Sequence, residues 1–222
     1  KYMKKVITIL LSFIFISFQS AQAEMGFGIT GAAHFFDADG TETTRSSNEK
    51  NTGSHSEDVL VPELFIEAIT DNGGAIGISY IPTRELGSKS RSDTSTTGDG
   101  QDTGTYTAKA ELDNVVQLYA DIPMTELLGY SLYGKLGLQH ATITTLESLN
   151  SGSTYPDENV LGFTIGLGTK GDLAFGNNLY YKAEATYTSF EDYEADSSSS
   201  PANKVEAELE DIAVKFSIGY KF

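Results

Sequence analysis

The sequence contains no cysteine, so no disulfide can contribute to the stability of the fold. Basic residues are also scarce, because 15 lysines and arginines stand against 31 aspartates and glutamates. Nucleic-acid binding needs a basic surface, so this charge balance argues against a nucleic-acid partner. Burial and hydrogen bonding must therefore stabilise the fold, in a molecule that repels anionic surfaces.

No apolar run in the sequence is long enough to cross a membrane as a helix. The run Val6–Phe18 is shorter than the ~20 residues that a membrane-spanning helix needs. It follows Lys4 and Lys5 and precedes Ala21-Gln22-Ala23, the order of basic segment, apolar segment and cleavage site in a secretory signal peptide. We therefore predict that residues 1–23 are a cleaved signal peptide and that residues 24–222 form the mature, exported domain.

Large apolar residues are nearly missing from several tracts of the remaining chain. These tracts are Asp39–Glu57, Gly87–Gly104, Ser148–Glu158 and Ala195–Lys204. Such polar sequences cannot bury enough surface to fold by themselves, so we predict four long loops. Short connections lie between them, at Asp71–Gly74, Pro123–Gly129 and Lys170–Asn178, of which the first is a typical tight turn.

Between these connections, large apolar side chains recur at every second position, and no segment shows the apolar stripe of a helix. This pattern predicts eight strands. Their expected bounds are Met25–Asp37, Asp58–Thr70, Ala75–Glu85, Thr105–Ile122, Tyr130–Thr145, Asn159–Thr169, Leu179–Tyr193 and Val205–Phe222. Long and short connections alternate, so an up-and-down antiparallel arrangement places all long loops at one end and both termini at the other.

Each predicted strand has one apolar face and one face of small or charged residues. In a soluble barrel the apolar face would point inward, whereas in a membrane barrel the order is inverted. Strand length, loops that are long at one end only, and aromatic residues near the strand ends favour the membrane. We therefore predict an all-β fold, a closed up-and-down antiparallel eight-stranded transmembrane β-barrel, and keep a soluble ligand-binding barrel as an alternative.

Three residues do not fit this pattern. Asn114 and His140 fall on the predicted apolar face, so we expect a bulge or an early strand end at each of them. Pro82 should lie at a strand end or a bulge, because proline cannot donate a hydrogen bond to a neighbouring strand.

The charged residues of the opposite face should pair with one another inside the barrel, because an unpaired buried charge is costly. The predicted polar network consists of Glu63, Glu67, Lys109, Glu111, Asp121, Lys135, Lys182, Glu184, Asp211 and Lys215. Eight strands leave an interior that side chains can fill, so we expect a plugged lumen. A narrow conducting path is the alternative.

The sequence gives little support for catalysis or metal binding. Its histidines are His34, His55 and His140, and it has no G-x-S-x-G nucleophile motif. The stretch Asp37–Gly40 departs from the calcium-loop pattern and lacks its closing glutamate. We therefore predict a protein that is not an enzyme, with no catalytic residue, no metal site and no cofactor.

The ending Phe216-Ser217-Ile218-Gly219-Tyr220-Lys221-Phe222 resembles that of the small outer-membrane β-barrel proteins of Gram-negative bacteria, of the porin-like, opacity-protein or OmpA-type kind. The resemblance implies that Phe216, Ile218, Tyr220 and Phe222 form a signal that the barrel-assembly machinery reads. It also implies a location in the cell outer membrane, in contact with lipid and lipopolysaccharide, with periplasmic termini and extracellular loops. The expected role is structural, or binding of an unknown extracellular partner through the acidic loops. The alternative is a small porin-like channel or a conduit for a hydrophobic ligand.

Overall fold

The computed structural model describes residues 23–44, 48–93, 104–128, 130–148, 154–174, 176, 178–198 and 202–222. The predicted signal peptide lies outside these residues except for its last position, and so does part of each predicted long loop. No helix of the described residues is long and apolar enough to span a membrane.

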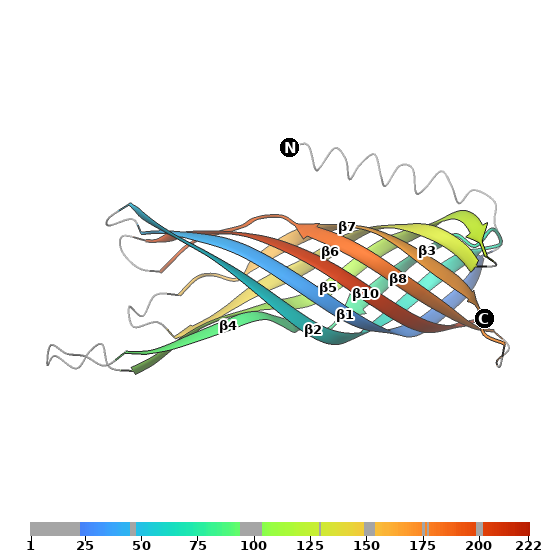
Figure 1. Cartoon of the computed structure of the whole chain (residues 1–222), viewed down its shortest axis with the longest axis horizontal. Helices are drawn as coiled ribbons and strands as arrows, with labels where there is room; N and C mark the ends of the chain where they lie inside the picture. Colours follow the sequence, from blue (N-terminus) through green and yellow to red (C-terminus); the bar gives the residue numbers. More distant parts are fainter. Residues whose placement is uncertain are drawn as a thin grey trace, which may run out of the picture.

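Ten β-strands form one antiparallel sheet that closes on itself (Figure 1). They are β1 (Ala23–Thr44), β2 (Glu49–Thr70), β3 (Ala75–Ile81), β4 (Arg84–Asp93), β5 (Gly104–Leu127), β6 (Tyr130–Ser148), β7 (Glu158–Asp172), β8 (Leu179–Phe190), β9 (Tyr193–Asp196) and β10 (Lys204–Lys221). Pairing of β1 with β10 closes the ring. β3 and β4 pair one after the other with the same strand, β5, and β8 and β9 both pair with β10. Each of these two pairs therefore fills the place of one strand, and the ten strands make an eight-stranded ring. The predicted eight-stranded up-and-down barrel is confirmed.

The two ends of the barrel differ as predicted. The short connections and the C-terminus lie together at one end, here called the turn end, at the right of Figure 1. The strands run much further toward the opposite end, the loop end, than was predicted. Residues Asp39–Thr44 and Glu49–Ser54 pair with each other, and so do Gly87–Asp93 and residues 104–110. The prediction that these tracts are loops is therefore wrong.

The extension is built from polar residues, which explains the error. Its threonines and serines suit strands, and their hydroxyls bond across the sheet, as Ser90 does with Thr107 at 2.8 Å. The prediction treated a lack of large apolar residues as a lack of structure. Backbone pairing with a neighbouring strand needs no apolar side chain, so such a tract can continue a hairpin that is anchored elsewhere.

The faces of the strands point as predicted for a membrane barrel. In β10 and the residue after it, Val214, Phe216, Ile218, Tyr220 and Phe222 are exposed on the outside, whereas Lys215 and Ser217 are buried inside. Exposed large apolar residues also cover the outer surface of the other strands, and include Phe27, Ile29, Leu64, Ile66, Ile78, Leu118, Ile122, Leu161, Ile165 and Leu167. This order is the reverse of that in a soluble barrel.

A bulge in β5 reverses the faces of that strand. The register with β6 shifts between Asp113 and Val116, and Asn114 has a left-handed backbone with φ of 51°. The bulge that was expected at Asn114 is therefore confirmed. Its consequence was not foreseen, because Leu112, predicted on the outer face, is completely buried inside. The break expected at His140 is not found, since β6 continues through it to Ser148.

The interior of the barrel has two layers of different chemistry. The half nearer the turn end is filled by charged and hydroxyl side chains together with large tyrosines. Tyr119 and Tyr180 fit because glycines face them: a Cβ on Gly77 or Gly219 would lie 2.4 Å or 2.3 Å from the tyrosine ring. The half nearer the loop end is apolar, and its buried residues are Phe36, Val61, Ile81, Leu86, Leu112, Val115, Ala141, Ile143, Val160, Phe190, Tyr193, Ala195 and Leu209.

Candidate functional site

Five charged residues of the interior form a cluster near the turn end, here called the lower cluster. The Nζ atom of Lys182 lies 3.0 Å from Glu67 and 2.6 Å from Asp121. The Nζ atom of Lys135 lies 3.1 Å from Asp121 and 2.8 Å from Glu184. Three acids thus surround two lysines in a space that contains almost no water, where each charge depends on its neighbours.

A second group, here called the upper cluster, lies closer to the loop end. The Nζ atom of Lys215 donates to Glu63 at 2.7 Å, and His34 lies between Glu63 at 3.1 Å and Asp211 at 2.8 Å. Carboxylates only accept hydrogen bonds, so both nitrogens of His34 donate at once only in the charged imidazolium. In that state two cations match the two acids of this cluster.

The structure brings eight of the ten predicted network residues together in these clusters, and His34 joins them. The other two, Lys109 and Glu111, lie elsewhere, because the bulge at Asn114 turns them to the outer surface. There Lys109 contacts Glu85 at 3.0 Å and Glu111 at 2.7 Å. The hydrogen bond with Glu111 raises the pKa of Lys109 above its ordinary value.

The two clusters close the barrel interior. The cavity that remains among them has a volume of about 10 Å³, which is roughly the space of one water molecule. Among the described residues, the side chains of this half of the barrel therefore fill the lumen and leave no room for solutes. We call the two clusters together the plug.

A larger cavity lies inside the loop-end half of the barrel, and we call it the vestibule. Its volume is about 450 Å³, within the range of about 300–1,000 Å³ that is usual for small-molecule sites. The lining is largely apolar and includes Ala38, Leu86, Ala110, Ile143, Tyr155, Tyr193, Val205, Ala207 and Leu209. The barrel thus holds a hydrophobic chamber that is open toward the loops and closed by the plug.

The wall of this chamber is interrupted on one side. β2 pairs with β3 only from Leu64 to Ile69, and no backbone pair joins β2 to β4 in the parts of these strands that the structure describes. Extending the register by two positions sets Pro62 opposite Pro82, and neither proline has an N–H to donate. In Figure 1, β2 and β4 run apart toward the loop end. We call the break between residues 49–63 and residues 84–93 the seam.

A second break in the wall is sealed. Beyond Ile143, β6 has no strand partner in β7, but the segment Thr154–Asp157 fills the space. Thr145 bonds to the carbonyl of Tyr155 at 2.7 Å, and Ser198 bonds to that of Thr154 at 2.9 Å. The seam between β2 and β4 has no such covering segment among the described residues.

One side chain bridges the seam. The imidazole of His55, on β2, lies so close to Gly87 of β4 that a Cβ there would be 2.4 Å from the ring. Both residues line the vestibule. His55 is about half exposed, and its other neighbour is Glu57 at 3.2 Å. His55 therefore reaches across the seam at the height of Gly87.

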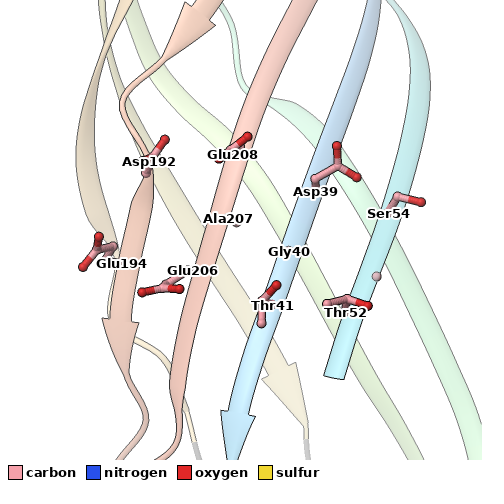
Figure 2. Close-up of a pocket in the computed structure, with 11 residues that line it drawn as sticks. Asp39, Gly40, Thr41, Thr52, Ser54, Asp192, Glu194, Glu206, Ala207 and Glu208 are labelled. Carbon is pink, nitrogen blue, oxygen red and sulfur yellow. The ribbon is translucent and has the colours of Figure 1, made fainter. Parts of the chain in front are cut away.

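The outer face of the loop-end extension is acidic (Figure 2). Asp39 is opposite Glu208 in the register of β1 with β10, and Glu194 is opposite Glu206 in that of β9 with β10. Lys204 contacts both members of the second pair, and its hydrogen bond lowers the pKa of Glu206. Within the described residues, no three His, Asp or Glu side chains are grouped to hold a metal ion.

Sequence reasoning missed the vestibule, the seam and the interior positions of His34 and Arg84. A signal existed for His34, because it alternates with Thr30 and Ala32 on the inner face of β1. A signal also existed for the seam. Pro62 and Pro82 lie almost equally far along the chain on either side of the tight turn at Asp71–Gly74, so the two prolines face each other in the hairpin.

Comparison with known proteins identifies the fold. No family model and no curated protein matches the chain. Among solved structures, it is similar to the outer membrane protein OprG from Pseudomonas aeruginosa, with a TM-score of 0.58 and 14% identity over 92% of this chain and 98% of that one. It is also similar to the outer membrane protein AlkL, with a TM-score of 0.51 and 11% identity over 91% of each chain. The outer membrane protease OmpT from Escherichia coli matches with a TM-score of 0.51 and 8% identity over 92% of this chain and 99% of that one.

Proposed function

We propose that this chain, which has the fold of the outer-membrane β-barrel proteins, binds a small apolar molecule in the vestibule and releases it sideways through the seam into the membrane. Of the two roles expected from the sequence, this is the hydrophobic-ligand conduit. The structural or surface-binding role stays a prediction, and part of each loop that would carry it lies outside the described residues.

The outer surface supports a location in the outer membrane. The exposed apolar side chains form a band around the barrel between the turn end and the height of the seam, and lipid is the environment that stabilises such a band. Pairing of β1 with β10 closes the ring, and below the seam each described strand of this band is paired on both sides. In this orientation the turn end is periplasmic and the loop end extracellular.

The observation that carries the proposal is the position of the seam beside an apolar chamber. The plug blocks the direct route to the periplasm, so a ligand in the vestibule can leave only toward the loops or through the wall. At the base of the seam, Leu60 is 85% exposed on the outer surface, which provides an apolar exit into lipid. This route favours an apolar molecule, because the molecule passes from the vestibule into lipid without exposing its apolar surface to water.

The first test of this proposal fills the vestibule. We expect Ala110→Phe to weaken binding of N-phenyl-1-naphthylamine, an uncharged fluorophore, by about tenfold or more, because the added ring occupies the space of the ligand. Binding is measured by fluorescence with the protein in phosphatidylcholine nanodiscs, against empty nanodiscs as background.

Leu146→Phe is the matched control. Leu146 is exposed on the outer surface of the neighbouring strand and does not line the vestibule, so its replacement adds a ring outside that cavity. We expect its affinity for the fluorophore to be unchanged. Equal affinity of both variants and the unmodified chain, or no binding by any of them, would overturn the proposed function.

A further inference from the structure

Arg84 is a buried cation of the interior that contacts no acidic side chain among the described residues. It is 4% exposed, and none of its three guanidinium nitrogens has a hydrogen-bond partner. The guanidinium lies 4.9 Å from the centre of the Phe36 ring. A buried guanidinium with unused donors is costly to the fold, so its presence calls for a physical reason.

Arg84 belongs to the layer directly beneath the vestibule. Leu86, Ala110 and Ala38 line that cavity. The next inward-facing residues toward the turn end on these three strands are Arg84, Leu112 and Phe36. All three are buried. Arg84 is also the first residue of β4, at the base of the seam. A ligand that enters the vestibule with one end toward the plug therefore reaches this layer first.

The acids of the plug already contact other side chains. In the upper cluster, Lys215 contacts Glu63, and His34 contacts both Glu63 and Asp211. In the lower cluster, where acids outnumber lysines, the additional cation is Lys170, whose Nζ lies 5.0 Å from the Tyr133 ring at the turn end. Arg84 takes part in none of these contacts and lies at the boundary between the plug and the apolar chamber.

We propose that the ligand of the vestibule is a single-chain amphiphile with an oxyanion head, such as a long-chain carboxylate, and that Arg84 binds this head while the vestibule holds the apolar chain. The inference rests on the proposed function and deepens it. Guanidinium binds a carboxylate through two parallel hydrogen bonds, which would use two of its five N–H donors.

The competing account is that Arg84 only balances Asp211. One oxygen of that carboxylate, Oδ1, also has no hydrogen-bond partner, and the two charges attract each other without forming a salt bridge. In that account the guanidinium serves the fold, and the vestibule has no preference for an anionic head.

The test compares two probes with the same apolar chain, one with an anionic head and one with an uncharged head. Dodecanoate and methyl dodecanoate are titrated against bound N-phenyl-1-naphthylamine in phosphatidylcholine nanodiscs, with the unmodified chain, Arg84→Met and Arg84→Lys. We expect dodecanoate to bind about tenfold more tightly than its ester, and this preference to vanish in Arg84→Met and to be partly kept in Arg84→Lys. Affinity for the ester should not fall in either variant.

Three outcomes would overturn the inference. If the unmodified chain binds both probes equally while the fluorophore still binds, the proposed function stands and the oxyanion site does not. If Arg84→Met fails to fold and Arg84→Met/Asp211→Asn folds with the dodecanoate preference intact, the guanidinium only balances Asp211. If phosphatidylglycerol in the nanodisc abolishes dodecanoate binding, the site takes a lipid head and not a free amphiphile. Failure of the fluorophore itself to bind identifies failure of the proposed function.

Discussion

Replacing Lys182 with methionine is expected to lower the free energy of unfolding of the barrel by about 3–5 kcal/mol, the range found when one member of a buried ion pair is removed. Lys182 is 2% exposed and contacts both Glu67 and Asp121. The substitution keeps the length of the side chain but leaves the lower cluster with three acids and one lysine. The measurement is urea unfolding of the refolded protein in phospholipid vesicles.

Lys109→Met is the matched control for this experiment. Lys109 also contacts two glutamates, Glu85 and Glu111, but it does so on the outer surface, where water screens the charges. We expect no measurable change in the unfolding free energy. A similar loss in both variants, or no loss in Lys182→Met, would contradict the description of the plug as a dry network of mutually dependent charges.

A disulfide across the seam is expected to abolish ligand release. The chain has no cysteine of its own, so the double variant His55→Cys/Gly87→Cys contains a single possible bridge. It would join β2 to β4 where the side chain of His55 now reaches across the seam. We expect cells that carry the oxidised variant to lose the protein-dependent uptake of N-phenyl-1-naphthylamine, and to regain it after treatment with a reductant.

The control places the same bridge where the strands are already paired. Gly40 and Gly53 are register partners on β1 and β2, and both border the vestibule, so Gly40→Cys/Gly53→Cys adds a disulfide without crossing the seam. Uptake by this variant should not depend on its redox state. If the seam disulfide forms and uptake continues unchanged, lateral release through this break is ruled out.

The sequence predicted the barrel and the direction of its faces, because alternation with a period of two follows directly from strand geometry. The ending Val214–Phe222 was assigned residue by residue, and the structure agrees. The same reasoning failed at Lys109 and Glu111, because a bulge shifts the phase of every residue beyond it. Asn114 marked the place of the bulge, but the prediction did not reverse the faces of the residues that precede it in β5.

The chemistry of the loop-end half was harder to predict. The vestibule is built from residues such as Ala38, Ala110 and Ala207, which are small and occur in strand segments that look merely polar. They form one apolar chamber only because the strands continue toward the loop end and curve around a common axis. Cavities of this kind depend on contacts between distant strands, and a single sequence contains no local signal for them.

Electrical conductance in planar bilayers tests the central claim most directly, that the ligand leaves through the wall and not along the lumen. The plug leaves a cavity of about 10 Å³ among its charges, so the account predicts no unitary currents from a preparation of the chain that supports uptake of N-phenyl-1-naphthylamine in cells. The contradicting result is a steady unitary current from that preparation that the disulfide between positions 55 and 87 leaves unchanged. Such a current would show a path along the lumen.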